Sequence, residues 1–448
     1  MWGQCMDKET FTSWSRAYAS RSWRFEPVSQ KDVLTLFEAC DEYGVIPRGL
    51  GNSYGDQALN TGGGIVSLQS FVNEKELVVS DQGCISVTGG TSYEMLLSAC
   101  IRQGWIVPVV PGSKSITIGG AIAADAHGKN HFHQSSISSC LIEMDVLIAN
   151  GKVVKCSRSH ESELFWATVG GLGLTGLILR ASIQLGKNYS NNFNVQSGKY
   201  SNFEQLFEQF KETTVNHPYS VAWLDLVSKK NAGRGVIQSA SPILESSETF
   251  SYKASKHITI PKVLPFNVVN KVNGGVYNAI RFNSHPSGVK RRQVPIPDFL
   301  HPLDRVKNWN NLYGKKGFFQ WQIVVPETEE LLLNEIIKRL NNLPLLPTLA
   351  VLKRLGSESD SYLSFCKPGW TLAIDFPFTN ISCRNQLNDF DRELAKAGGR
   401  IYLAKDGGVN PEFLNEMYPR LREWKQIRKK FDPDNVWQSD LSRRLHLA

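Results

Sequence analysis

The glycine-rich stretch at residues 109–130 constrains this chain more than any other feature. It reads VVPGSKSITIGGAIAADAHGKN and contains almost no large side chain. A glycine exposes its backbone amide and lets another group approach closely, which an ordinary hydrophobic core does not require. The stretch therefore predicts a binding site for an extended polar cofactor.

Length and charge limit the class of protein. A chain of 448 residues is too long for one ordinary core, so we expect two domains. Its 50 basic and 42 acidic residues give a net charge of +8, which is not the profile of a dedicated nucleic-acid binder. This balance is compatible with an anionic substrate, an anionic membrane surface or an ordinary solvated basic surface.

Cysteines and apolar runs indicate the compartment. The eight cysteines form no Cys-x-x-Cys pair, which favours a reducing compartment over a zinc or redox motif. We see neither a signal-peptide pattern nor an apolar run of about 18 residues. His131 and His133 have no carboxylate or thiolate at ligand spacing, so we predict no metal site. We expect a cytoplasmic protein, with peripheral contact at the inner membrane as an open alternative.

Hydrophobic periods and capping residues predict the elements. A capping box begins a helix at residues 29–40, and Thr91-x-x-Glu94 begins another that ends near Gly104. Further helices are expected at 202–211, 328–340 and 410–430, and strands at 45–47, 65–68, 76–79, 84–87, 105–110, 144–148, 177–183, 318–325, 370–376 and 400–404. Residues 239–298 are the least regular and predict a flexible loop or lid.

Composition changes along the chain near residues 188 and 400. Residues 1–188 contain three glycine-rich runs between short helices and strands, whereas residues 189–400 contain fewer glycines and more aromatic residues. Regular patterning returns after residue 400. These changes predict a cofactor domain, a separate middle domain and a C-terminal segment.

Several sequence blocks together carry a resemblance to a known family. They are RGLGNSYGD at 48–56, residues 111–120, HGKNH at 127–131, FWATVGGLGLTG at 165–176, and shorter blocks at 299–304, 317–322, 402–406 and 439–445. In this order they resemble the vanillyl-alcohol-oxidase type of FAD-dependent oxidoreductases. Within that family the chain is similar to the branch that oxidises a polyprenyl-phosphate ribose. Each block is weak alone, but their spacing over nearly the whole chain is specific.

The resemblance implies the fold and the cofactor. We expect an α+β fold, with a two-part FAD-binding domain at 1–188 completed by 401–448, and an antiparallel-sheet substrate (cap) domain at 189–400. The first two loops would hold the pyrophosphate through backbone amides, and the third would lie by the adenine or ribitol. The residues implied to bind FAD are Arg48, Gly49, Gly51, Asn52, Ser53, Tyr54, Gly55, Gly112, Thr117, Ile118, Gly119, Gly120, Ala124, His127, Gly171, Ile178 and Tyr402.

Two positions depart from the pattern of relatives. Many relatives attach FAD covalently through a histidine at the position of Asn52. Asparagine has no nucleophilic ring nitrogen, so we expect FAD to be bound non-covalently. Ala373 stands where some relatives carry a cysteine, so we expect thiol-directed inhibitors to fail here.

The resemblance also implies the catalytic groups. Alcohol oxidation requires a flavin for the redox step and a protein group at the reacting hydroxyl. Lys405 is the leading candidate, either as a base with a lowered pKa or as a cation that stabilises an alkoxide. His127 and Lys129 would act beside it, with Lys129 facing a phosphate. The residues implied to bind substrate are Lys129, Trp223, Tyr313, Gln320, Gln322, Lys353 and Lys405.

Purely structural interpretations of these residues remain open. Lys405 could be a surface lysine, His127 a satisfied core residue beside a solvated Lys129, and Gln320 with Gln322 an exposed strand face.

The implied activity is the FAD-dependent oxidation of the C2 hydroxyl of a polyprenyl-phosphate ribofuranose. The 2-keto product would be the first half of an epimerisation to the arabinose form for the cell envelope, completed by an NADH-dependent keto-reductase partner. One alternative is an aldonolactone or sugar oxidase that uses oxygen. Another is a flavin-free relative that only binds a sugar or a protein.

Overall fold

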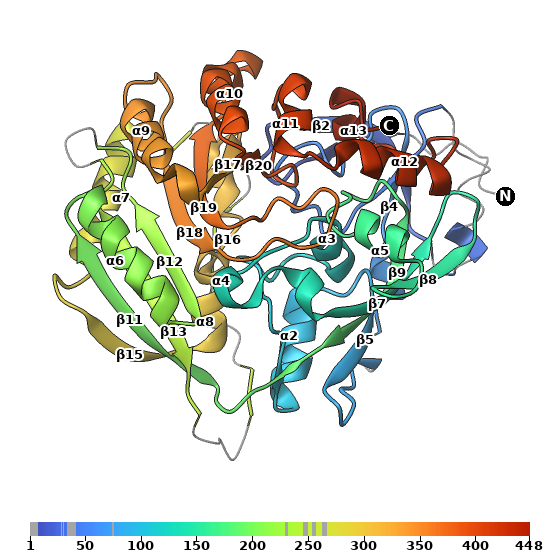
Figure 1. Cartoon of the computed structure of the whole chain (residues 1–448), viewed down its shortest axis with the longest axis horizontal. Coiled ribbons are helices and arrows are strands. Elements are labelled where there is room, and N and C mark those ends of the chain that lie inside the picture. Colours follow the sequence, from blue (N-terminus) through green and yellow to red (C-terminus); the bar gives the residue numbers. More distant parts are fainter. Residues whose placement is uncertain are drawn as a thin grey trace.

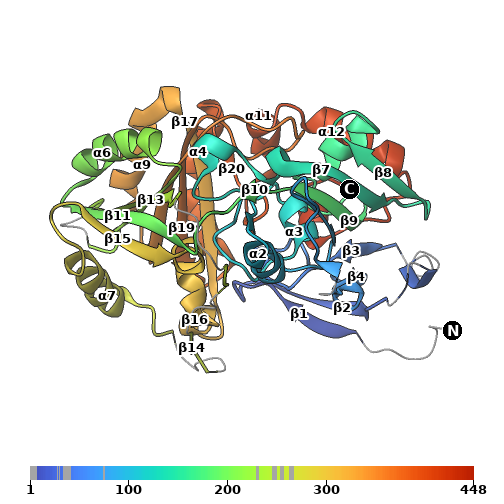
Figure 2. The ribbon, with the colours of Figure 1, turned by 90° about the horizontal axis from the view of Figure 1, so that it is seen from below.

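The computed structural model describes residues 8–27, 29, 31–33, 42–73, 76–228, 232–244, 250–252, 257–261 and 267–448. Within these residues, two four-stranded sheets lie on one side of the molecule and an eight-stranded sheet lies on the other (Figures 1 and 2). Helices cover the sheets on the outside. This arrangement confirms the predicted α+β fold class.

The two small sheets form the predicted two-part cofactor region. The first has the order β1-β2-β4-β3, from β1 (Glu9–Thr12), β2 (Ala19–Phe25), β3 (Val45–Pro47) and β4 (Gly64–Val66). The second has the order β5-β9-β7-β8, from β5 (Cys84–Thr88), β7 (Leu141–Leu147), β8 (Val153–Ser157) and β9 (Leu177–Gln184). Helices α2 (Tyr93–Arg102) and α3 (Ile118–Ala123) precede β7.

The cap sheet has the order β15-β11-β13-β12-β18-β19-β17-β20, and every pairing in it is antiparallel. Its strands are β11 (Asn192–Tyr200), β12 (Tyr219–Leu224), β13 (Gly235–Pro242), β15 (Lys290–Pro295), β17 (Phe318–Pro326), β18 (Leu349–Leu355), β19 (Gly369–Pro377) and β20 (Arg400–Ile401). Helices α6 (Phe203–Asn216), α9 (Glu330–Leu340) and α10 (Asn388–Lys396) cover one face.

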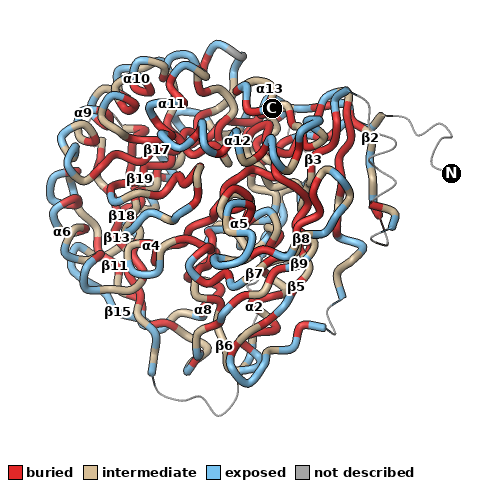
Figure 3. Tube along the Cα trace, turned by 45° about the vertical axis from the view of Figure 1, so that its right-hand side comes forward, coloured by how far each residue is buried: buried red, intermediate tan, exposed pale blue. Residues whose placement is uncertain are grey.

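Side-chain alternation gives the cap sheet two different faces. Trp321 and Trp370 point to the helix-covered face, where Phe207 of α6 and Phe390 of α10 contact them. On the other face, directly paired positions form the row Gln322, Ala373, Val351 and Trp223 across four strands. Paired side chains share a face in an antiparallel sheet, so this row belongs to one polar surface, which we call the substrate face. Figure 3 shows the two central strands buried, β17 along its whole length and β19 as far as Phe376.

Shorter elements complete the described chain. Strand β6 (Trp105–Ile106) pairs with β10 (Gly186–Lys187), and β14 (Ile258–Thr259) pairs with β16 (Val306–Lys307). The remaining α-helices are α4 (His131–Gln134), α5 (Ser162–Thr168), α7 (Lys271–Asn283), α8 (Ile296–Leu300), α11 (Leu414–Met417), α12 (Leu421–Phe431) and α13 (Asp440–Arg444). No helix in the described part of the chain is long and apolar enough to cross a bilayer.

Several local predictions were wrong. Ser92, not Thr91, caps α2, because its side chain accepts the amide of Met95. Residues 77–80 form no strand, and the strands expected at 105–110 and 400–404 shorten to two residues each. The helix expected at 410–430 is divided at Tyr418 between α11 and α12.

Residues 239–298 also differ from the expected loop or lid, because they contain α7, β15 and most of α8. Most of the helix expected at 29–40 lies outside the described residues, although the capping bonds between Ser29 and Asp32 are present.

Candidate active site

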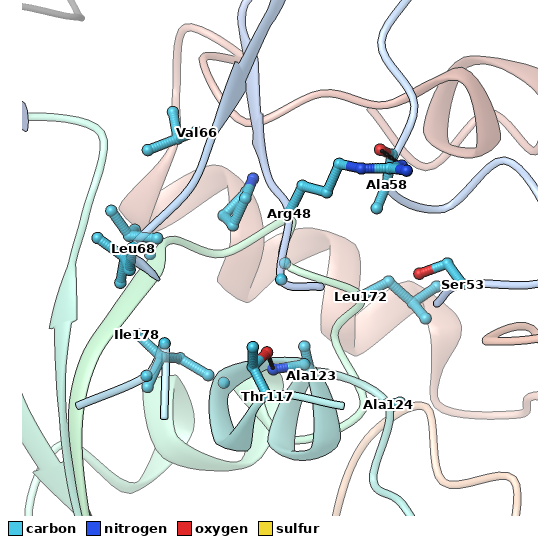
Figure 4. A pocket seen from close by; sticks show the side chains of 18 of the residues that line it. Arg48, Ser53, Ala58, Val66, Leu68, Thr117, Ala123, Ala124, Leu172 and Ile178 are labelled. Atoms are coloured by element: carbon cyan, nitrogen blue, oxygen red, sulfur yellow. Dashed lines mark hydrogen bonds between the residues drawn. The ribbon is translucent and has the colours of Figure 1, made fainter. Parts of the chain in front are cut away.

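A cavity of about 780 Å³ lies where the glycine-rich runs meet (Figure 4). Both small sheets contribute to its wall, so the cavity joins the two parts of the cofactor region. Its lining includes Pro47, Arg48, Gly49, Ser53, Gln57, Ala58, Val66, Leu68, Gly89, Gly90, Thr117, Gly119, Gly120, Ala123, Ala124, Leu172, Gly173, Gly176, Leu177, Ile178 and Ala404.

The first glycine-rich loop presents free backbone donors. The amides of Gly49, Gly51, Asn52 and Ser53 have no hydrogen-bond partner within the described residues. Such consecutive amides form an anion-binding nest. The guanidinium of Arg48 fixes the loop, because it donates to the carbonyl oxygens of Ala58 at 2.9 Å and Thr12 at 2.7 Å. Figure 4 shows this side chain directed toward Ala58.

The second run supplies open space beside the cavity. Thr117 caps α3, and its hydroxyl accepts the amide of Gly120 at 3.1 Å. A Cβ placed on Gly120 would meet only that hydroxyl within 4 Å, at 3.0 Å, whereas a Cβ on Gly49 would collide with the Thr117 side chain. The glycines thus keep a cradle open that side chains would fill, and these residues fit the pyrophosphate and ribityl part of FAD.

Some residues expected at FAD do not line this cavity. The side-chain amide of Asn52 donates to the Ser115 carbonyl, and this hydrogen bond links the first and second glycine-rich loops. A Cβ on Gly55 would meet the Asp406 carbonyl, and one on Gly171 would meet the Ala167 carbonyl, so these two glycines permit close chain packing. The expected residues that do not line the cavity are Gly51, Asn52, Tyr54, Gly55, Gly112, Ile118, His127, Gly171 and Tyr402.

Ala404 connects the cavity to Lys405. Residues 402–406 form a turn in which the amides of Lys405 and Asp406 donate to the Tyr402 carbonyl. Arg444 fixes this turn by binding both Asp56 carboxylate oxygens at 2.9 Å and one oxygen of Asp406 at 3.2 Å. The ammonium of Lys405 lies 5.0 Å from the centre of the Tyr54 ring. Lys405 is therefore held in a half-buried position and is not a solvated surface lysine.

A buried carboxylate faces this lysine from the cap sheet. Asp375 on β19 is 0 % exposed, and Gln320 donates to its Oδ1 at 2.6 Å. Its Oδ2 has no partner within the described residues. Burial raises the pKa of Asp375, and burial lowers the pKa of Lys405, while the charge of each group favours the ionised form of the other. Asp375 was not among the expected site residues. The alternation of positions 371, 373 and 375 along β19 was the sequence signal that could have placed it on the substrate face.

His127 is a neutral member of the same cluster. Burial lowers its pKa well below the usual range, and the nearby Lys353, His131 and Lys405 lower it further. Gln322 donates to His127 Nε2 at 3.2 Å and to the Thr371 hydroxyl at 3.0 Å. His127 Nδ1 and Gln322 Oε1 have no partner in the described residues. Both glutamines are buried, so these polar atoms are available to a ligand and do not form an exposed strand face.

Two further lysines bring positive charge to the substrate face. Burial, followed by the charge of Lys405, lowers the pKa of Lys353 to about 7. Burial and Lys353 lower the pKa of Lys129 to about 7, against the opposing effect of Asp304. Lys129 donates to the carbonyl oxygens of Phe299 and Leu300. The ammonium of Lys129 therefore holds the end of α8 in place, and Lys129 is not a freely solvated lysine.

The last two expected substrate residues, Trp223 and Tyr313, are buried against other side chains. Trp223 is buried, and the guanidinium of Arg281 on α7 lies 4.9 Å from its ring. Tyr313 is buried, stacks on Phe318, and shares a 2.7 Å hydrogen bond with the hydroxyl of Thr348. The structure thus brings Lys405, Lys353, His127, Gln320 and Gln322 together, and it places Trp223 beneath α7.

Comparisons with known proteins identify the family of this chain. The model of an FAD binding domain matches residues 23–157, and the model of D-arabinono-1,4-lactone oxidase matches residues 319–445. The chain is 36% identical over 415 residues to decaprenylphosphoryl-beta-D-ribose oxidase of Mycolicibacterium smegmatis, covering 90% of this chain and 89% of that protein. It is 30% identical to an uncharacterised protein of Streptomyces coelicolor, covering 79% and 99%.

A more distant relative lies in the lactone-oxidase group. The chain is 26% identical to D-arabinono-1,4-lactone oxidase of Eremothecium gossypii, covering 48% of this chain and 40% of that protein. The similarity to the ribose oxidase is higher and extends over both the glycine-rich cavity and the cap sheet. The chain therefore belongs to the decaprenylphosphoryl-β-D-ribose oxidase family and is an FAD-dependent oxidoreductase.

Proposed function

We propose that this protein oxidises the C2 hydroxyl of a polyprenyl-phosphate ribofuranose to the 2-keto sugar. One observation supports the proposal most directly. Ala404 lines the FAD cavity, and the next residue, Lys405, interacts electrostatically with Asp375 and Lys353 of the substrate face. The cofactor cavity and the positively charged part of the substrate face therefore adjoin at Ala404 and Lys405.

In this proposal Lys405 accepts the proton of the reacting hydroxyl. The bound flavin supplies hydride acceptance. Burial lowers the pKa of Lys405, so a useful fraction of its amine is neutral near neutral pH and can take a proton. Gln322 and His127 carry the free acceptor and donor that would orient the sugar hydroxyls.

Lys129 and Lys353 would recognise the phosphate. Each has its pKa lowered to about 7 by burial, so both lysines are only partly charged near neutral pH when no anion is bound. A bound phosphate would restore the charge of both, because an adjacent anion favours the protonated amine. This coupling favours an anionic sugar over a neutral one.

The cofactor and partner assignments follow from the same site. We propose that FAD is bound non-covalently, because Asn52 offers only an amide that already donates to Ser115. Denaturation should therefore release the flavin into the supernatant. The keto product requires a second hydride donor to reach the arabinose form, so an NADH-dependent keto-reductase is the proposed partner. We also propose that residues 1–188 and 401–448 form the FAD-binding domain and that residues 189–400 form the cap domain.

Anaerobic bleaching of the flavin tests the function. The FAD-loaded protein is mixed with a polyprenyl-phosphate ribose, free ribose or an aldonolactone, and the flavin absorbance is followed. We expect bleaching by the phosphate-linked ribose and little by free ribose. Bleaching by the lactone alone would replace this proposal with the lactone-oxidase alternative, which the match of residues 319–445 makes the natural competitor. The variant Lys405→Met should bind the substrate and fail to bleach.

A further inference from the structure

The positive charge of this chain is concentrated in one segment. Residues 249–297 contain eight lysines and arginines and no aspartate or glutamate. The net charge of the whole chain is +8, so the remaining residues carry equal numbers of each sign. A segment with this imbalance attracts anionic surfaces.

Helix α7 lies within this segment and exposes an apolar stripe. Val272, Val276 and Ile280 follow one another at one-turn spacing and are 73%, 56% and 66% exposed. The adjacent Tyr277 is also exposed. Side chains four residues apart lie on one side of a helix, so α7 displays a continuous apolar stripe to the outside. Figure 2 shows α7 at the lower edge of the molecule, beside β15.

The opposite side of α7 attaches it to the cap sheet. Asn278 donates to the carboxylate of Asp225 at 2.8 Å. Phe282 packs against Trp223 and Val236. Since these contacts fix the polar and aromatic side of α7 inward, the exposed orientation of its apolar stripe is a stable feature of the fold.

Basic residues border the apolar stripe. Lys271 is the first residue of α7, and Lys290, Arg291 and Arg292 form the exposed start of the edge strand β15. Lys271, Lys290 and Arg291 form no ion pair within the described residues. An apolar stripe with basic residues beside it is the pattern of helices that lie in the headgroup region of anionic membranes.

We propose that α7 and the start of β15 dock this protein onto an anionic lipid bilayer. The proposal rests on the proposed function, since a polyprenyl-phosphate sugar is held in a membrane. Trp223, which Arg281 and Phe282 of α7 cover, lies on the substrate face in the same row as Gln322. Docking through α7 would therefore bring the substrate face to the membrane surface.

Other occupants fit the surface less well. A nucleic acid would satisfy the basic residues but offers no apolar surface for Val272, Val276 and Ile280. A second copy of the chain would oppose two segments of like charge. An anionic bilayer satisfies both the charged and the apolar parts.

Vesicle co-sedimentation of the full-length, FAD-loaded protein tests the proposal. Vesicles of phosphatidylglycerol with phosphatidylcholine are compared with vesicles of phosphatidylcholine alone. The double variant Val276→Glu/Ile280→Glu should bind the anionic vesicles at least ~10-fold more weakly, because it removes two apolar groups that would enter the membrane and adds two negative charges. The triple variant Lys290→Gln/Arg291→Gln/Arg292→Gln should lose a similar factor at low salt and little at high salt.

Leu331→Glu is the matched control. Leu331 is 81% exposed and lies on α9, which covers the opposite face of the cap sheet, so its replacement should leave vesicle binding unchanged. Flavin absorbance and thermal melting check that each variant is folded. Equal binding by the wild type and the α7 double variant, or no binding to anionic vesicles, would overturn the proposal. So would self-association of the free protein that the α7 variant abolishes, or binding to duplex DNA without binding to vesicles.

A substrate assay separates this proposal from the proposed function. The α7 double variant should oxidise a short-chain, water-soluble polyprenyl-phosphate ribose at the wild-type rate and a vesicle-embedded one about tenfold more slowly. Failure of both proteins to bleach with any phosphate-linked ribose would refute the function, while vesicle binding would still decide the role of α7.

Discussion

The electrostatic interaction of Asp375 with Lys405 leads to a specific pH prediction. Asp375→Asn removes one negative charge near Lys405 without changing the side-chain volume. The amide oxygen that it introduces can still accept the hydrogen bond from Gln320, which is 2.6 Å long in the wild type. The substitution therefore tests the charge of Asp375 separately from its shape.

The structure sets the size of the expected shift. An adjacent opposite charge raises the pKa of a lysine by about 1–3 units. Within the described residues Lys405 and Asp375 form no ion pair of 4.0 Å or shorter, and burial raises the pKa of Asp375 so that part of it is neutral near neutral pH. We therefore use the lower end and expect the pKa of Lys405 to fall by about one unit, or about 1.4 kcal/mol.

The pH dependence of the rate of anaerobic flavin bleaching measures this change in the pKa of Lys405. If neutral Lys405 is the base, the rate rises with pH, and the rise in Asp375→Asn should occur about one pH unit lower. Asp389→Asn is the control, because Asp389 is an exposed carboxylate on α10 that accepts from Arg392, away from the site. An unmoved rise, or one moved to higher pH, would refute the proposed interaction. A rate that falls with rising pH would instead identify Lys405 as a cation that stabilises an alkoxide.

Three other substitutions or conditions test the remaining parts of the site. Burial holds His127, His131 and His301 neutral, with the pKa of His131 and His301 lowered to about 3. The unfolded chain binds protons below about pH 6.5 and the folded chain does not, so denaturant titration should show about 4 kcal/mol less unfolding free energy at about pH 5.5 than at neutral pH. Gly120→Val places a side chain in the cradle and should lower FAD affinity at least ~10-fold, read as the ratio of flavin to protein absorbance. Thiol-directed inhibitors should leave the wild type unmodified, whereas Ala373→Cys, on the substrate face beside Gln322, should give a covalent adduct by mass measurement.

The stability and flavin-content predictions each have a control variant. His160→Gln, at an exposed position, should not alter the loss of stability at low pH. Gly288→Val enters open space outside the FAD cavity, so it should keep full flavin content. A wild-type adduct within the site, or an unchanged flavin ratio in Gly120→Val, would contradict the corresponding assignment.

The cofactor region was largely predictable because its chemistry is local. Gly49 and Gly119 allow neighbouring parts of the chain to pack closely, and Gly120 leaves space in the cavity. Glycine is the residue that meets these needs within a short loop, so they can be recognised in the sequence itself. The alternation in β17 likewise placed Gln320 and Gln322 on one face, as the structure confirms. The absence of a histidine at position 52 needed no structure either.

Helix α7 was missed for a different physical reason. Hydrophobic period normally identifies the buried side of a helix. In α7 the side formed by Val272, Val276 and Ile280 faces outward, while Asn278 and Phe282 face the cap sheet. The pattern therefore conflicts with the usual interpretation, and only the tertiary contacts to Asp225 and Trp223 determine which side is inside.

Sequence by itself determined the α+β class and the FAD cradle, and its family resemblance predicted Lys405 as the leading polar group. Only the tertiary structure decided what surrounds that lysine. Asp375 and Lys353 reach it from two neighbouring strands of the cap sheet, and Arg444 fixes its turn from the C-terminal helix. These contacts join residues far apart in the chain, and the burial that lowers the pKa of Lys405 exists only when the cap sheet and the cofactor region meet.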